Sequence, residues 1–312
     1  MRRLSILAAL LGAALCLAAP AGAASSSFRI GFGEQRAGMF TNSHWTKLNL
    51  PDARLLIGWD ALRYRWQRRE IDHWMAAAEA AGARPLVSFS RSRAPWRHRK
   101  LPSAAEYERQ FLRFRERYPS VTSFLAWNEA NHCSQPTCRR PEMAARYFDV
   151  MQGACPECRV VAADVLDTDD MVPWLLAFRR AAKHTPRIWG LHNYLDANRF
   201  RTSGTLRMLR AVKGEIWFTE TGGLVKRKST SPIKFPDSPS HAAKATRWVL
   251  TRLAPLSPRI KRIYLYHFQN QGPDANWDSG LLDPHGRPRP AYGVLQRYVS
   301  RLQRPRRSPA DR

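Results

Sequence analysis

Short apolar runs recur along the chain at fairly even intervals, and stretches with helical periodicity separate most of them. The apolar runs are rich in β-branched and aromatic residues, a pattern that is typical of buried strands. The predicted strands are Phe28–Gly33, Ala53–Trp59, Arg84–Phe89, Ser123–Trp127, Arg159–Ala163, Arg187–His192, Glu215–Thr219 and Ile260–Tyr266. The predicted helices include Glu70–Ala81, Ala104–Tyr118, Pro141–Met151, Met171–Ala182, Thr205–Val212, Ser240–Leu253 and Ala291–Leu302.

This alternation of strand and helix predicts an α/β protein made of a single (β/α)8 barrel, the TIM barrel. The 312-residue length is sufficient for one such domain. We expect the barrel to occupy residues 25–303. The segment 304–312 is basic and contains proline, so we expect it to be a disordered tail.

The amino terminus predicts a secretory signal peptide over residues 1–24. Arg2 and Arg3 precede an apolar run that is too short for a comfortable membrane span, and small residues follow near Ala23. We expect cleavage after Ala23 or Ala24 and a secreted protein. No second apolar run approaches spanning length, so we expect no membrane association after cleavage.

Four cysteines remain after that cleavage, namely Cys133, Cys138, Cys155 and Cys158. In an exported chain, cysteines more often form disulfides than remain thiols. The short polar loops favour the local pairs Cys133–Cys138 and Cys155–Cys158. The spacing also fits a zinc site, which remains the alternative, although an oxidising compartment disfavours four free thiolates.

The chain is strongly basic, with 51 lysines and arginines against 25 aspartates and glutamates and a net charge of +26. Of the basic residues 42 are arginine, a skew typical of genomic base composition rather than of a selected nucleic-acid site. So positive a field still concentrates polyanions. For an exported protein the candidate partners are acidic polysaccharides and anionic cell-wall polymers, and no nucleic-acid fold signature is present.

Two glutamates, Glu129 and Glu220, each close a predicted buried strand. The carboxyl ends of barrel strands are where this fold builds its active sites. Two carboxylates on opposite strands supply what cleavage of a glycosidic bond needs, a proton donor and a nucleophile or base. The alternative for each glutamate is a simple ion pair with one of the many arginines.

Asn128-Glu129 on the fourth strand, Glu220 on the seventh and the eight-strand pattern resemble the clan A glycoside hydrolases. The segments 277–283 and 286–292 also resemble the stretch that many of these enzymes carry before the last helix. Ala130 departs from the pattern, because the group often has proline there. The resemblance implies a retaining enzyme in which Glu129 is the general acid/base and Glu220 the nucleophile. We expect neither a metal nor another cofactor.

The remaining candidate residues have binding roles. Asn128 is expected to hydrogen-bond the sugar 2-hydroxyl, with a turn or cap as its alternative. The same resemblance implies that Tyr194 orients Glu220 and that His192 contacts substrate, although a buried structural histidine is the alternative for His192. Because sugars stack on aromatic rings, further candidates for substrate binding are Tyr266, His267, Trp277 and Trp59. Three acidic residues at other strand ends are expected to be wall residues that pair with arginine, with the lining of sugar subsites as the alternative: Glu34, Asp60 and Asp164.

Together these features predict an exported retaining β-glycosidase that hydrolyses O-glycosidic bonds in a polysaccharide or oligosaccharide. The alternative is a barrel that binds carbohydrate or an anionic cell-wall polymer without turnover. The pair Glu129 and Glu220 favours the enzyme, because a purely binding protein has no chemical need for both.

Overall fold

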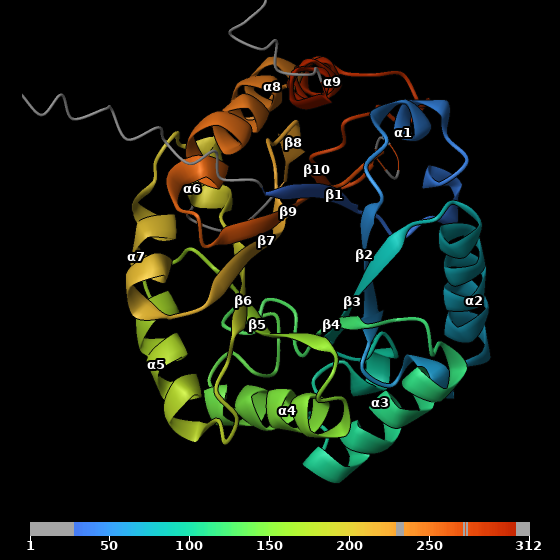
Figure 1. The fold of residues 1–312 in the computed structure, drawn as a ribbon, viewed down its shortest axis with the longest axis vertical. Coiled ribbons are helices and arrows are strands. Elements are labelled where there is room, and N and C mark those ends of the chain that lie inside the picture. The colour runs from blue at the N-terminus through green and yellow to red at the C-terminus, as the bar shows by residue number, and fades with distance from the viewer. Residues whose placement is uncertain (1–27, 229–233, 271, 273, 304–312) are drawn as a thin grey trace, which may run out of the picture.

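The computed structural model describes residues 28–228, 234–270, 272 and 274–303. The predicted signal peptide and the basic tail lie outside the described residues, so both remain predictions. Within the described part, eight parallel strands close into a barrel in the order β1-β2-β3-β4-β5-β6-β7-β9. The helices surround the strands as an outer ring (Figure 1). The predicted (β/α)8 barrel is therefore confirmed.

The barrel strands lie close to their predicted positions. They are β1 (Arg29–Gly33), β2 (Asp52–Gly58), β3 (Arg84–Ser90), β4 (Ser123–Leu125), β5 (Arg159–Leu166), β6 (Ile188–His192), β7 (Glu215–Thr221) and β9 (Ile260–Tyr266). Two short strands, β8 (Lys226–Arg227) and β10 (Trp277–Asp278), pair antiparallel outside the barrel and join the loops that follow β7 and β9. The barrel closes where β1 pairs with β9, for example with Ile30 opposite Ile263.

The helices likewise agree with the prediction to within a few residues, apart from short elements near the barrel mouth. They are α1 (Ser43–Leu48), α2 (Arg65–Ala80), α3 (Ala104–Arg117), α4 (Pro141–Ala154), α5 (Met171–Ala181), α6 (Tyr194–Asn198), α7 (Ser203–Ala211), α8 (Pro239–Trp248) and α9 (Pro290–Gln303). The prediction missed α1 and α6, because elements of five or six residues are too short to display a periodicity. It also extended α8 through Val249–Leu253, which continues the helix as a π-helical turn.

Two apolar cores follow from the alternation of side chains along the strands. The larger core lies between the outward faces of the strands and the helix ring. A smaller cluster fills one end of the barrel interior and consists of Leu86, Leu125, Val161, Ile188, Trp217 and Tyr264. The inward positions nearer the carboxyl ends of the strands carry polar residues instead, for example Ser88 and Arg54. The chemistry of the barrel is therefore confined to its carboxyl-terminal mouth.

Among the described residues, none of the helices combines the length and the apolar character that crossing a membrane requires.

Candidate active site

Glu129 and Glu220 converge at the mouth of the barrel. Glu129 follows β4, Glu220 lies near the end of β7, and His192 ends β6 between them. One carboxylate oxygen from each glutamate and one ring nitrogen of His192 all lie within 4.8 Å of one another. The two carboxylates predicted from strand ends are thus brought together around a single small space.

Arg54 is a fully buried cation that links several of these groups. Its Nη1 donates to Glu220 Oε2 at 2.9 Å, and its Nη2 donates to Asn128 Oδ1. Its Nε donates to Ser88 Oγ at 2.9 Å. Burial acts to lower the pKa of Arg54, but the charges of Glu220 and Asp164 raise it overall, so this guanidinium stays charged.

Asp164, on β5, is a second fully buried hub of the site. Its Oδ2 lies 3.0 Å from His192 Nε2 and 3.4 Å from Arg54 Nη2. Its Oδ1 accepts from the backbone N–H of Glu129. Gly190 makes room for it, because a Cβ on Gly190 would lie 2.4 Å from the Asp164 Cβ. One carboxylate therefore positions both the main chain of Glu129 and the ring beside its side chain.

The backbone of Glu129 is itself unusual, with a φ of 47° in the left-handed region. Non-glycine residues adopt this region infrequently and at an energetic cost. The hydrogen bond to Asp164 holds the turn in place, and so do those of the flanking residues, from Asn128 N to Phe89 O at 2.8 Å and from Ala130 N to Asp164 O at 2.9 Å. These bonds keep the Glu129 carboxylate at the barrel mouth.

Glu220 accepts hydrogen bonds on both carboxylate oxygens. Arg54 donates to Oε2, and the Tyr194 hydroxyl donates to Oε1 at 3.1 Å. Tyr194 therefore contacts Glu220 as predicted. Asn128 is only 4% exposed, and its Oδ1 accepts from Arg54. Its side-chain N–H groups have no partner among the described residues.

The electrostatic setting of the three central groups is mixed. Burial raises the pKa of Glu220, and the cations of His192 and Arg54 only partly offset this effect. Burial also acts to raise the pKa of Glu129, but the hydrogen bond and charge of His192 lower it overall. The pKa of His192 is raised to about 10, because the charges of Asp164 and Glu220 outweigh its burial. A proton is thus held within this cluster well above neutral pH.

By distance alone, Glu129, His192 and Glu220 could also ligate a metal ion. The permanent positive charge of Arg54, 2.9 Å from Glu220, opposes a divalent cation at that position. Cys155, Glu157 and Cys158 form a second such group, but the two cysteines are joined in a disulfide and offer no thiolate.

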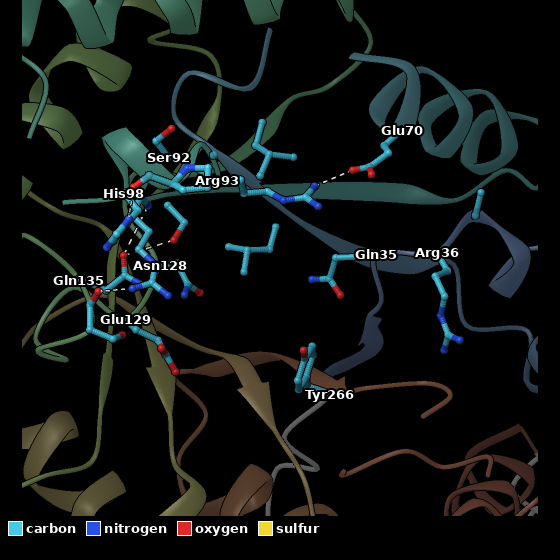
Figure 2. A pocket seen from close by; sticks show the side chains of 18 of the residues that line it. Gln35, Arg36, Glu70, Ser92, Arg93, His98, Asn128, Glu129, Gln135 and Tyr266 are labelled. Atoms are coloured by element: carbon cyan, nitrogen blue, oxygen red, sulfur yellow. Dashed lines mark hydrogen bonds and ion pairs between the residues drawn. The ribbon is translucent and has the colours of Figure 1, made fainter. Parts of the chain in front are cut away.

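A cavity of about 1220 Å³ opens beside Glu129 and extends over the loops that follow β1, β2 and β3. Figure 2 shows Glu129 and Tyr266 facing the open space from one side, with Arg93 and Glu70 along the opposite side. Asn128 and Tyr266 both line it. This volume is large enough for several sugar units, since ligand pockets commonly hold 300–1,000 Å³.

Three of the predicted substrate contacts require correction. Trp59 is only 1% exposed and is covered by Arg97, whose guanidinium lies 5.2 Å from the ring, so Trp59 is a core residue. His267 is 3% exposed and does not line the cavity. His192 is fully buried, so it contacts Glu129 rather than a sugar.

Tyr266 lines the cavity, and Trp277 is partly exposed beside Tyr194 although it is not among the lining residues, so these two remain candidates for sugar contact. Trp277 is partly buried and packs edge-to-face on Tyr194, with ring centroids 4.8 Å apart. Its Nε1 donates to Ser279 Oγ at 3.0 Å, which fixes the ring orientation. The pair β8 and β10 carries Trp277 to this position, a placement that single-strand patterns do not predict.

The structure pairs Cys133 with Cys138 and Cys155 with Cys158, as the local spacing predicted. The loop closed by the first pair carries Ser134 and Gln135, which line the cavity. The second pair precedes β5 and lies at the other end of the barrel strands.

Three wall residues behave as expected, since each pairs with an arginine: Glu34 with Arg36, Asp60 with Arg97 and Asp164 with Arg54. The contact of Asp164 with His192 was not foreseen, and neither was Arg54 itself. An available signal was the charge of Arg54 within the otherwise apolar stretch 53–57, because an inward charge on a buried strand needs partners.

The sequence matches a known protein family. Residues 101–294, more than half of the sequence, match the model described as the glycosyl hydrolase catalytic core. The chain belongs to this glycosyl hydrolase family. It is therefore a glycoside hydrolase, in agreement with the resemblance to clan A drawn from the sequence. Among curated proteins, none matches this sequence.

Solved structures share the fold of this glycoside hydrolase at low sequence identity. A family 39 glycoside hydrolase from Bacteroides cellulosilyticus WH2 superposes with a TM-score of 0.57 and 13% identity over 88% of this chain, which spans 64% of that protein. GH5_18 from Streptomyces cattleya, solved in complex with GlcNAc, has a TM-score of 0.63 and 16% identity, and the match covers 90% of this chain and 82% of that one. Xylanase 10B from Thermotoga maritima has a TM-score of 0.62 and 14% identity, and the match covers 90% of this chain and 97% of that one. At these identities the likeness establishes the barrel fold.

Proposed function

We propose that the protein is an exported retaining β-glycosidase that acts by double displacement, with Glu220 as nucleophile and Glu129 as general acid/base. The observation that carries this proposal is the approach of the two carboxylates, whose oxygens lie within 4.8 Å of each other. Retaining enzymes hold their carboxyl groups about 5–5.5 Å apart, whereas inverting enzymes leave about 6.5–9.5 Å for a water molecule.

The hydrogen bonds to Glu220 support its role as nucleophile. Arg54 is a donor that cannot accept a proton, and together with Tyr194 it engages both oxygens of Glu220. Both donors favour the anionic form of Glu220 and fix the direction in which its carboxylate points. Burial opposes this ionisation and raises the pKa of Glu220, and the permanent charge of Arg54 offsets that effect in part.

The contact between Glu129 and His192 supports the acid/base role. His192 Nε2 faces Asp164, so its Nδ1, 3.3 Å from Glu129 Oε1, is free either to donate to the carboxylate or to accept from its protonated form. A proton held by this pair is available to the glycosidic oxygen in the first step. In the second step, the same pair can take a proton from the attacking water.

The substrate would lie along the cavity beside Glu129. Asn128 has free amide donors next to both glutamates, which suits a hydrogen bond to the sugar 2-hydroxyl. Tyr266 on the cavity wall offers an aromatic surface for a sugar ring, and Trp277, which packs edge-to-face on Tyr194, offers a second one.

Export rests on the sequence of residues 1–24. Amino-terminal sequencing of the protein secreted by its native host tests this part. A mature chain that begins at Ala24 or Ser25 is expected, and retention of Met1 in the cell would contradict it.

The catalytic proposal is tested with a panel of aryl α- and β-glycosides, followed by NMR of the first-formed product anomer. Release of the β anomer from a β-glycoside is expected. Initial release of the α anomer would contradict double displacement. Absence of turnover across the panel and across neutral and acidic polysaccharides would favour the non-catalytic binding barrel instead.

A further inference from the structure

The walls of the cavity beside Glu129 are rich in basic groups. The basic and acidic side chains that line it, besides Glu129, are Arg36, Glu70, His73, Arg91, Arg93 and His98. Glu70 is therefore the single acidic side chain among the described lining residues apart from Glu129. The low-dielectric walls of a cleft focus the electric field of such charges, so a ligand inside the cleft experiences it strongly.

Two of the three arginines are already neutralised. Arg93 Nη1 lies 2.6 Å from Glu70 Oε2, an ion pair drawn in Figure 2. Arg36 Nε lies 3.1 Å from Glu34 Oε1, and its Nη2 also donates to the carbonyl of Gln269. These two guanidiniums are held by protein groups and bring little net positive charge to the cavity.

Arg91 differs, because no carboxylate within the described residues pairs with it. Its Nη1 donates to the carbonyl of Ser134 at 2.6 Å, in the loop closed by Cys133 and Cys138. The Nε and Nη2 donors have no protein partner in the described part of the chain. Arg91, a partly buried residue, is thus fixed by one guanidinium nitrogen and keeps two further donors on the cavity wall.

The loop that anchors Arg91 is itself held in place by hydrogen bonds of Gln135. Gln135 Oε1 accepts from Ser90 Oγ and from Trp127 Nε1, each at 3.3 Å, and this ties the end of β3 to the loop after β4. Gln135 is only 6% exposed. Because the carbonyl that anchors Arg91 belongs to this braced loop, little conformational freedom is lost when the guanidinium binds a ligand.

From this arrangement we propose that the cavity accepts an acidic saccharide and that Arg91 binds the carboxylate of a uronic acid unit. The planar guanidinium fork matches a carboxylate in a bidentate manner, which gives both strength and orientation. The inference rests on the proposed function, since it names the substrate class of the same site. It differs from general attraction to polyanions because it depends on one side chain in the cleft.

The test compares uronate trimers with their methyl esters, which keep the sugar shape and remove the charge. Trimers of β-linked glucuronate, galacturonate and mannuronate are titrated calorimetrically into full-length mature protein carrying Glu220→Gln, so that hydrolysis does not interfere. Salt at about 0.5 M screens the field of the distant surface charges. Glucan trimers sulfated at the same carbon show whether the recognised group is a carboxylate or any anion.

We expect at least one acid trimer to bind about tenfold more tightly than its own ester, a preference typical of one charge-assisted bidentate contact. Arg91→Gln should remove most of that preference. Arg113→Gln, which removes the same charge from the exposed face of α3, should leave it intact. Equal binding of acid and ester, no binding of any acid trimer, or an unchanged preference in Arg91→Gln would each overturn the proposal. Because binding is read directly, a failure here is distinct from a failure to hydrolyse glycosides.

Discussion

Asp164 Oδ2 lies 3.0 Å from His192 Nε2, while the opposite ring nitrogen of His192 lies 3.3 Å from Glu129 Oε1. The buried carboxylate, the imidazole and the proposed acid/base thus form a continuous chain from β5 through β6 to β4. Asp164 contacts neither the cavity nor the sugar site, so we regard it as a positioning residue that acts through His192.

Asp164→Asn should move the alkaline limb of the kcat/KM profile to lower pH. The charges of Asp164 and Glu220 outweigh burial and raise the pKa of His192 to about 10, and the charge of Asp164 also acts to raise that of Glu129. Removing this anion makes the pair release its proton earlier, by roughly one to three pH units if a single charge contact is lost. The measurement is kcat/KM for an aryl glycoside between pH 5 and pH 10.

The matched control is Asp60→Asn, because Asp60 is equally buried at the end of β2 and pairs with Arg97 instead of a histidine. It should lower stability without moving the alkaline limb. If Asp164→Asn lowers the rate while both limbs stay in place, Asp164 has only a structural role.

Asp167 should make the protein less stable as the pH rises from about 4 to about 7. Burial and the charge of Asp196 raise the pKa of Asp167 to about 7, so the folded state binds more protons than the unfolded state in this window. The free energy of unfolding therefore falls with rising pH, by roughly 2 kcal/mol between pH 5 and pH 8 from this group. The Tm difference between those two pH values should shrink in Asp167→Asn and persist in the surface control Asp169→Asn. An equal difference in all three proteins would contradict the assignment.

Trp277 and Trp59 should respond oppositely to substitution. Trp277→Ala should lower kcat/KM about tenfold with little change in Tm, because a partly exposed ring that stacks on a sugar is lost. Trp59→Ala should instead lower the free energy of unfolding by about 3–5 kcal/mol, because it leaves a cavity in the core. Kinetics and thermal unfolding of both variants check this. A Trp277→Ala enzyme with unchanged kinetics would remove Trp277 from the binding site.

The two disulfides should differ in what they support. Cys133→Ser with Cys138→Ser frees the loop that carries Ser134 and Gln135, so KM should rise several-fold. The disulfide between Cys155 and Cys158 lies away from the mouth, so replacing both cysteines with serine should affect only Tm. Mass mapping of nonreduced peptides should first find no free thiol among the four cysteines. Four alkylatable thiols, or bound zinc, would contradict both bridges.

The sequence was sufficient to predict the barrel because its strands are buried and short, and their apolar runs are separated by amphipathic helices. It was also sufficient for Glu129 and Glu220, since the carboxyl ends of parallel strands meet at one mouth. The prediction that Trp59 contacts substrate was wrong, because the sequence does not show whether an aromatic ring at a strand end turns into the core or toward the cleft. The cover by Arg97 comes from a different loop and leaves no local signal.

Arg54 and the contact between Asp164 and His192 show a second limit. These contacts join β2, β5 and β6, and they depend on register and on the space left by Gly190, which a single-strand pattern does not specify. Buried polar networks of this kind arise from several strands at once. Their members are recognisable in sequence mainly as charges that interrupt apolar strands.

The configuration of azide adducts tests the assignment of Glu129 and Glu220 most directly. With an activated β-aryl glycoside, Glu129→Ala should still form the glycosyl–enzyme, because a good leaving group needs little protonation. Azide needs no general base, so it should restore turnover and give the β-glycosyl azide. Glu220→Ala lacks the nucleophile, so azide should attack directly and give the α-glycosyl azide. The reverse pattern would exchange the two roles, and full activity in both variants would show that this pair does not catalyse the reaction.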